Sequence, residues 1–240
     1  CVSMRVALVL GSGGARGYAH IGVIRELEAR GHEIVGVTGC SMGSVVGGMY
    51  AAGKLDEFEA WVRKVQWAQV LWYMDLALSG PGLMRIDRIM DVLAEIVGDV
   101  EIQDLPLPYL AVAVDIAAQR EVWFTNGPLL TAIRASIAIP TAITPVVLNG
   151  RLLADGGMLN PLPLEPAAMV RADAVVAVSL MGRADNPFRV TEVESTPTPT
   201  DRVPGVVNAM SEAVGGAIDG VVGFLDRFTG RHDHDAIAVI

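Results

Sequence analysis

The sequence predicts an α/β protein built on a mainly parallel sheet. Its first part alternates short apolar runs with helical segments, separated by tight glycine turns. Apolar residues make up 52% of the 240 residues and charged residues 19%, a composition that suits a sheet covered on both faces. This length fits one large domain, or a domain with an appendage.

The first four elements form two strand–helix pairs. Residues 5–10, RVALVL, are mostly apolar and stop at a glycine loop, which favours a buried strand. Ala15–Arg30 has apolar residues at helical spacing and ends at a glycine, which favours a helix. Glu33–Gly39 is a second short strand, and Ser44–Ala52 a second helix closed by a glycine. This order predicts parallel βαβ units.

The later elements follow from the same two periodicities. We expect two amphipathic helices, two strands joined by a short turn, a helix opened by a proline, and a last buried strand. In that order they cover 55–65, 86–96, 108–116, 120–124, 128–139 and 173–180.

A change of composition after Gly182 divides the chain into three segments. Residues 1–182 form the folded domain, and residues 183–205, with four prolines and four threonines, form a linker or surface strap. Apolar residues at helical spacing in 206–240 predict an amphipathic helix followed by a polar tail. We expect this helix to pack on the domain; a dimer contact or a face lying on a membrane is the alternative.

Charge and cysteine content limit the partners and the compartment. The formal net charge of −9 argues against nucleic acid, which requires a basic surface. Contact with a membrane surface stays open, but it would be apolar rather than electrostatic. The two cysteines, Cys1 and Cys40, give neither a disulfide framework nor metal-ligand spacing, so we expect a cytoplasmic protein, with peripheral membrane contact as an option. The oligomeric state is not set by the sequence.

One uncharged stretch, Ile34–Gly53, is 20 residues long, which is enough to span a bilayer. It contains six glycines, and its apolar side chains fall into two short halves. Strand, turn and helix is therefore the better interpretation, and we expect no signal peptide before it.

The stretch between the second strand and the second helix has the pattern G-x-S-x-G, with Ser41 between Gly39 and Gly43. A nucleophile at a sharp strand-to-helix turn has strained backbone angles, so the residues two places away on either side must be small. Cys40 has larger residues at those places, and we expect it to be a small buried hydrophobe. The following helix favours negative charge at the serine. Ser41 is therefore the candidate nucleophile.

No histidine is an obvious base for Ser41. His20 is best explained as a hydrogen-bonded helix residue, and the other three histidines lie in a turn or in the polar tail. A carboxylate is the alternative, because burial raises its basicity. Asp155 follows a short apolar run and precedes two glycines, which let the backbone approach another group closely. Taken alone, this Asp-Gly-Gly is better explained as a plain turn.

The glycine loop GSGGARG, residues 11–17, opens the first helix, and two uses for it compete. A dinucleotide-binding turn would need an acidic residue at the end of the second strand, where the sequence has the serine turn instead. An oxyanion hole would use the N–H groups of Gly13 and Gly14, because turns after adjacent parallel strands share one sheet edge. Arg16 opposes the helix dipole, so we expect it to brace the loop or bind an anionic headgroup.

Together these motifs resemble the patatin-like phospholipase family, which are serine acyl hydrolases. The resemblance rests on GSGGARGYAHIGVI, GCSMGS, RASIAIPTAITPV and LLADGGMLNPLP, in that order, over about Val6–Leu180. It implies a Ser–Asp dyad in place of a triad, with Ser41 as the nucleophile and Asp155 as its base. It also implies that Gly13 and Gly14, with Arg16 alongside, form the oxyanion loop.

The resemblance further implies a three-layer α/β/α sandwich, with a mostly parallel central sheet and helices on both faces. It assigns residues 1–182 to an acyl hydrolase domain that uses no metal and no cofactor. The implied substrate is a lipid or another acyl ester. The sequence departs from the plant members at Ser12, where they have glycine, and from the usual threonine at Cys40.

The function we expect is hydrolysis of fatty acyl esters of phospholipids, lysophospholipids or related lipids through an acyl-enzyme intermediate. Trp67–Met84 is rich in large apolar side chains; core packing is the simpler explanation, and an acyl-pocket wall or a lid is the alternative. Two other functions stay open: a non-catalytic regulatory or scaffold protein on the same fold, and, less favoured, a nucleotide-binding oxidoreductase. The sequence does not rank lipid classes or chain lengths.

Overall fold

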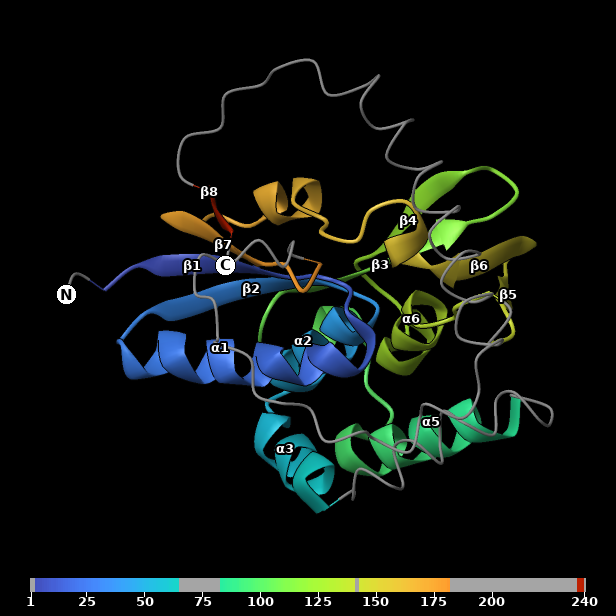
Figure 1. The fold of residues 1–240 in the computed structure, drawn as a ribbon, viewed down its shortest axis with the longest axis horizontal. Helices are drawn as coiled ribbons and strands as arrows, with labels where there is room; N and C mark the ends of the chain where they lie inside the picture. Colours follow the sequence, from blue (N-terminus) through green and yellow to red (C-terminus); the bar gives the residue numbers. More distant parts are fainter. Residues whose placement is uncertain (1–2, 65–82, 141–142, 182–236, 240) are drawn as a thin grey trace, which may run out of the picture. The chain divides into compact units, whose positions relative to one another are not determined.

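The computed structural model describes residues 3–64, 83–140, 143–181 and 237–239. The expected linker at 183–205, nearly all of Trp67–Met84 and most of the expected C-terminal helix and tail at 206–240 lie outside the described residues. Within those described, the chain forms one sheet with helices on both sides (Figure 1).

The sheet combines parallel and antiparallel strands in the order β5-β6-β3-β2-β1-β7-β8. Strand β4 lies outside this order and pairs with β3. Strands β3, β2, β1, β7 and β8 are mutually parallel, as the βαβ pattern predicts. Strands β4, β5 and β6 add antiparallel pairs. The bounds are β1 Arg5–Leu10, β2 Glu33–Cys40, β3 Tyr109–Asp115, β4 Arg120–Phe124, β5 Val146–Leu148, β6 Arg151–Asp155, β7 Ala174–Val178 and β8 Ile237–Val239.

Two strands meet end to end along one edge of β3. Strand β2 runs parallel to β3 and its last pair is Cys40 with Val112. Strand β6 runs antiparallel to β3 and its last residue, Asp155, pairs with Ala113. Because β4 pairs with residues of β3 that both of these strands also use, it must occupy the opposite edge. The carboxyl ends of β2 and β6 therefore abut beside Val112 and Ala113.

The helices are distributed unequally over the two faces of the sheet (Figure 1). Helices α1, α2 and α6 cover one face, and α3 and α5 pack beneath α2 and α6. On the other face, the short helix η5 packs against β1 and β2. The bounds are η1 Gly14–Tyr18, α1 Ala19–Ala29, α2 Met42–Ala51, α3 Leu55–Lys64, α5 Leu83–Val97, η3 Ile102–Asp104, α6 Leu129–Ser136, η4 Gly156–Met158 and η5 Glu165–Met169.

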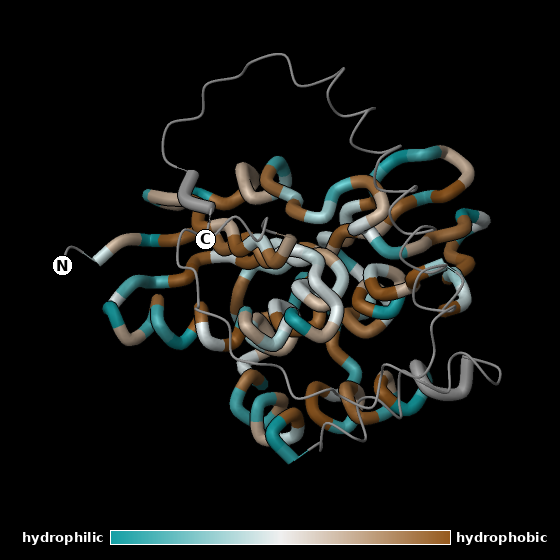
Figure 2. Tube along the Cα trace, viewed as in Figure 1, coloured by the Kyte–Doolittle hydropathy of each residue, from teal (hydrophilic) through white to brown (hydrophobic). Residues whose placement is uncertain are grey.

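The apolar residues gather in the strands and on the helix faces that cover them (Figure 2). Every residue of β3 is buried, which is the pattern of a strand covered on both faces. Phe58 of α3 and Leu93 of α5 are fully buried, so the outer helices extend the same core. The fold thus confirms the α/β class with helices on both sides.

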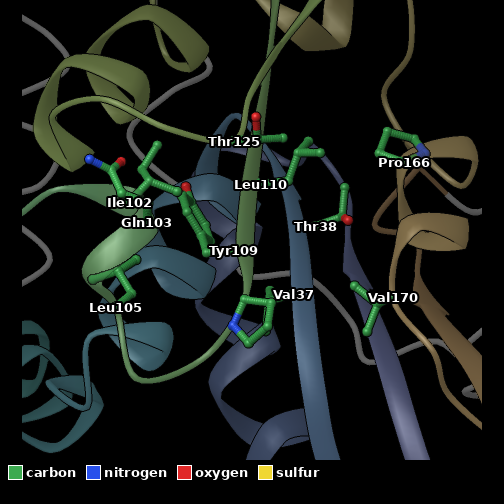
Figure 3. A pocket seen from close by; sticks show the side chains of 11 residues that line it. Val37, Thr38, Ile102, Gln103, Leu105, Tyr109, Leu110, Thr125, Pro166 and Val170 are labelled. Carbon is green, nitrogen blue, oxygen red and sulfur yellow. The ribbon is translucent and has the colours of Figure 1, made fainter.

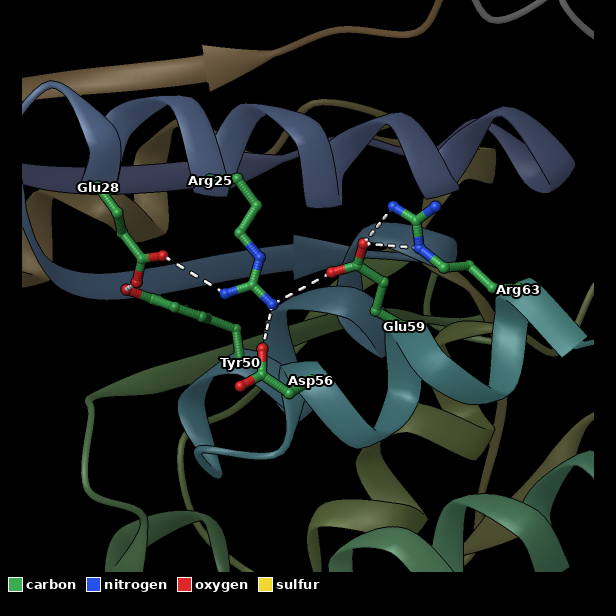
Figure 4. Close-up of polar contacts among 6 residues, drawn as sticks. All are labelled: Arg25, Glu28, Tyr50, Asp56, Glu59 and Arg63. Atoms are coloured by element: carbon green, nitrogen blue, oxygen red, sulfur yellow. Dashed lines mark hydrogen bonds and ion pairs between the residues drawn. The ribbon is translucent and has the colours of Figure 1, made fainter.

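A group of charged residues joins α1 to α3 at the surface (Figure 4). Arg25 of α1 lies against three carboxylates: Glu28 on its own helix at 3.7 Å, Glu59 of α3 at 3.1 Å, and Asp56 of α3. The hydroxyl of Tyr50 in α2 donates to Glu28 at 2.9 Å. These contacts link α1 to α3, whose Phe58 also packs in the core.

Several boundaries differ from those expected. The first helix begins with the 3-10 turn η1, whose first residue, Gly14, has a positive φ of 53°. The second helix begins at Met42, directly after Ser41. The uncharged stretch Ile34–Gly53 divides into β2 and α2, as expected. Among the described residues, no helix combines the length and the apolar character needed to cross a membrane.

Candidate active site

Ser41 lies at the sharp turn between β2 and α2, as the G-x-S-x-G pattern predicts. Its backbone angles are φ 53° and ψ −125°, outside the regions that residues with a side chain favour. The Ser41 carbonyl accepts the Ser44 N–H at 2.9 Å and the Ser44 hydroxyl at 2.7 Å, which anchor the turn to the first turn of α2. Such strain persists only where the surroundings hold it, and it is typical of functional sites.

The two flanking glycines are required by close backbone contacts. A Cβ at Gly39 would lie 2.5 Å from the carbonyl oxygen of Gly43 and 2.6 Å from the Cα of Ser44. A Cβ at Gly43 would overlap the Leu10 carbonyl oxygen and lie 2.8 Å from that of Gly11. The structure confirms that small residues are needed on both sides of Ser41.

Ser41 and Asp155 meet in a shared buried site. The Ser41 hydroxyl donates to Oδ2 of Asp155 at 2.5 Å, and both residues are 4% exposed. The other oxygen, Oδ1, accepts the N–H of Gly157 at 2.7 Å, so the carboxylate is held from two sides. The N–H of Asp155 donates to the carbonyl of Ala138 at 2.9 Å. The Asp-Gly-Gly segment is thus both a turn and the partner of the serine.

Burial raises the pKa of the Asp155 carboxyl above its ordinary value, because the charged form loses hydration. The hydrogen bonds from Ser41 and from the Gly157 N–H act in the opposite direction but do not cancel it. A carboxylate with a raised pKa is a stronger base than one in water.

The glycine loop contacts both the serine turn and the aspartate turn. A Cβ at Gly17 would overlap the side chain of Met42, the residue after the serine. A Cβ at Gly157 would lie 2.8 Å from the Ser12 hydroxyl. The Ser12 N–H donates to the Pro161 carbonyl at 2.7 Å. The three motifs therefore form one cluster at the carboxyl ends of β1, β2 and β6.

The N–H groups of Gly13 and Gly14 donate no hydrogen bond to any part of the chain that the structure describes. Gly14 adopts a φ of 53°, a conformation that favours glycine. The guanidinium of Arg16 donates to the Leu180 carbonyl at 3.5 Å, which ties the loop to the segment after β7. Arg16 is exposed, and the two roles expected for it remain predictions.

Cys40 and His20 are both fully buried near the serine turn and the glycine loop. The Cys40 thiol is fully buried, and burial raises its pKa well above the ordinary value, with a further contribution from the carboxylate of Asp155. A thiol that stays protonated is a poor nucleophile. The Nε2 of His20 is 2.8 Å from the Gly11 carbonyl, within hydrogen-bond distance, and burial lowers the pKa of this imidazole. His20 thus supports the glycine loop from the first helix.

One residue of the site was not singled out from the sequence. Ser136, the last residue of α6, is fully buried, and its hydroxyl accepts the Ser41 N–H at 2.9 Å. The same hydroxyl donates to the Val112 carbonyl at 2.6 Å. Ser136 lies within RASIAIPTAITPV, one of the segments that carried the family resemblance, so the signal was present without an assigned role.

A cavity of about 310 Å³ lies between the start of β3, η3 and η5 (Figure 3). Its lining includes Val37, Thr38, Tyr109 and Val170, but neither Ser41 nor Asp155. It therefore gives no binding pocket for a group attached to the serine. Within the described ranges no cluster of three or more His, Cys, Asp or Glu side chains could hold a metal ion.

Comparison with known proteins places these motifs in a family. The sequence profile described as Patatin-like phospholipase matches residues 8–168, which include the glycine loop, Ser41 and Asp155. A protein of Mycobacterium tuberculosis described as an uncharacterized NTE family protein is 55% identical over 194 residues, which are 81% of this chain and 54% of that protein. The human patatin-like phospholipase domain-containing protein 6 is 33% identical over 182 residues, 73% of this chain and 13% of that protein.

Among solved structures, the crystal structure of VipD from Legionella pneumophila aligns with a TM-score of 0.46 at 13% identity, covering 100% of this chain and 61% of that one. The chain spans about half the length of the mycobacterial relative, at 54%. The profile covers most of the described residues and all three motifs of the site. The chain therefore belongs to the patatin-like phospholipase family.

Proposed function

We propose that this protein is a serine acyl hydrolase that cleaves fatty acyl esters of phospholipids, lysophospholipids or related lipids. The observation that carries the proposal is the 2.5 Å hydrogen bond from the Ser41 hydroxyl to Asp155, at a strained turn with both side chains buried. Family membership supports a lipid as the substrate. We assign the activity to residues 1–182, of which the family profile matches 8–168.

In the first half of the reaction, Asp155 Oδ2 accepts the hydroxyl proton of Ser41 while the serine Oγ attacks the ester carbonyl carbon. The N–H groups of Gly13 and Gly14 stabilise the negative oxygen of the tetrahedral intermediate. The carbon–oxygen bond to the alcohol or lysolipid breaks, and this group leaves with the proton held by Asp155. The fatty acyl group is then esterified to Ser41.

In the second half, Asp155 accepts a proton from water, and the water oxygen attacks the acyl carbonyl. The bond to Ser41 Oγ breaks, the proton returns to the serine, and the fatty acid leaves. The raised pKa of Asp155 supports its role as the base in both halves. The buried position of the carboxylate supports the same role, because burial makes the charged form a stronger base.

The test is active-site labelling by a fluorophosphonate probe together with hydrolysis of p-nitrophenyl acyl esters. Ser41→Ala and Asp155→Asn should each lose both activities, because one removes the attacking oxygen and the other the base. Cys40→Ala is the matched control, since it removes the adjacent nucleophile, and it should be labelled like the wild type. Normal hydrolysis by either dyad variant would refute the proposal. A folded wild type that neither reacts with the probe nor cleaves esters would favour a scaffold protein on this fold.

A further inference from the structure

The hydrogen bonds between β2 and β3 change at the nucleophile. The N–H of Val37 donates directly to the Pro108 carbonyl at 2.9 Å, as in a regular parallel ladder. Two residues make one repeat of that ladder, and Cys40 pairs with Val112. The pattern therefore directs the N–H of Ser41 toward the Val112 carbonyl.

The hydroxyl of Ser136 takes the place of that direct bond. It accepts the N–H of Ser41 at 2.9 Å and donates to the Val112 carbonyl at 2.6 Å. The chain can thus leave the sheet at Ser41 while both backbone groups keep a partner. Without the hydroxyl, a buried N–H and a buried carbonyl would lose their partner, which is unfavourable inside a protein.

The same segment also holds the other member of the dyad. The carbonyl of Ala138, two residues after Ser136, accepts the N–H of Asp155 at 2.9 Å. The Val112 carbonyl, which Ser136 contacts, lies so close to Gly156 that a Cβ there would approach it to 2.5 Å. The end of α6 therefore contacts the backbone on both sides of the Ser41–Asp155 hydrogen bond.

We propose that Ser136 is a positioning residue that holds Ser41 in its strained conformation and so sets the distance between its hydroxyl and Asp155. Ser136 does not touch the substrate in this proposal; it acts through the N–H of Ser41. The proposal rests on the acyl hydrolase function for its kinetic consequence. Its structural consequence, the conformation of Ser41, is independent of activity.

The test compares Ser136→Ala with Ser136→Cys and with Ile24→Val, a mild change in the core of α1 away from the site. Ser136→Ala should lower kcat and the rate of fluorophosphonate labelling by about 10- to 100-fold with KM unchanged, because misplacement of a reacting group by about 1 Å costs up to that factor. Ser136→Cys, which keeps a weak donor and acceptor, should fall between Ala and the wild type. Ile24→Val should keep the wild-type rates.

A crystal structure of Ser136→Ala gives the second readout. We expect Ser41 to leave the positive φ region, or its hydroxyl to move out of hydrogen-bond distance of Asp155. Wild-type rates for Ser136→Ala, or an unchanged Ser41 in its crystal structure, would overturn the positioning role. If the wild type itself does not react with the probe, the proposed function fails, while the crystal structure still decides the role of Ser136.

Discussion

Substitution of Gly43 by alanine tests how tightly the serine turn is built. The new Cβ would overlap the Leu10 carbonyl oxygen and lie 2.6 Å from the Leu10 carbonyl carbon. The second distance is roughly 1 Å short of a favourable contact. Leu10 cannot easily move, because it pairs with Gly39 on one side and Val178 on the other. We expect a loss of about 3 kcal/mol in the free energy of unfolding, the upper end for overpacking.

For a protein of this size, that loss corresponds to a fall in Tm of roughly 6–12 °C. Gly22→Ala is the matched control, because Gly22 is exposed in α1 and a Cβ there meets nothing within 4 Å. It should gain about 1 kcal/mol from helix propensity. Thermal unfolding measures both variants, and labelling by the probe measures the site. A Gly43→Ala variant with unchanged Tm and labelling would refute the steric account of the serine turn.

Three further outcomes are expected. Burial raises the pKa of Asp155, so protonation of this carboxyl stabilises the folded state. That stabilisation is complete below pH 3.8 and is lost as pH rises through the folded-state pKa. In urea unfolding, Asp155→Asn should therefore be more stable than the wild type at pH 8 and lose that advantage near pH 4. Burial lowers the pKa of His20 below 6.5, so the folded state favours the neutral imidazole. The Tm of the wild type should therefore fall as pH drops from 6.5 through the folded-state pKa. His20→Gln should show a smaller fall in Tm over that range. Arg25→Gln should lower stability by no more than about 1 kcal/mol, because its ion pairs are exposed, and the difference should vanish in about 1 M salt.

The serine turn could be predicted because its requirements are local. Gly39, Ser41 and Gly43 lie within five residues, and the steric rule that selects serine over Cys40 needs no tertiary information. The parallel strands followed from apolar runs that are buried on both faces. The structure confirms the parallel strands and has Ser41 at the turn between β2 and α2, while its role as nucleophile remains a prediction.

The partner of the serine could not be derived in the same way. Asp155 meets Ser41 because β2 and β6 approach each other along one edge of β3, and nothing in the spacing of the sequence states that pairing. Resemblance to the family supplied the residue instead. Ser136 was missed because a serine at the end of a helix has no local feature that reveals a buried backbone partner.

The β5–β6 hairpin was missed although its signal was present. Asn149 and Gly150 form a two-residue turn with φ values of 51° and 74°, and an Asn-Gly pair between apolar runs is a strong hairpin pattern. Strand β8 had no such signal, because it has three residues and follows a long segment of different composition. Short strands depend on their neighbours rather than on their own periodicity.

The abutting ends of β2 and β6 have a consequence for how such a protein can diversify. Ser41 and Asp155 are 114 positions apart, yet their strands meet beside β3, where Cys40 pairs with Val112 and Asp155 pairs with Ala113. Of the chain between them, the end of α6 also contacts both residues, through Ser136 and Ala138. Insertions or deletions in the loops outside these elements would therefore leave the contacts that separate the reacting atoms in place, while they reshaped the surroundings of the site. New acyl preferences could arise there with no change in the chemistry.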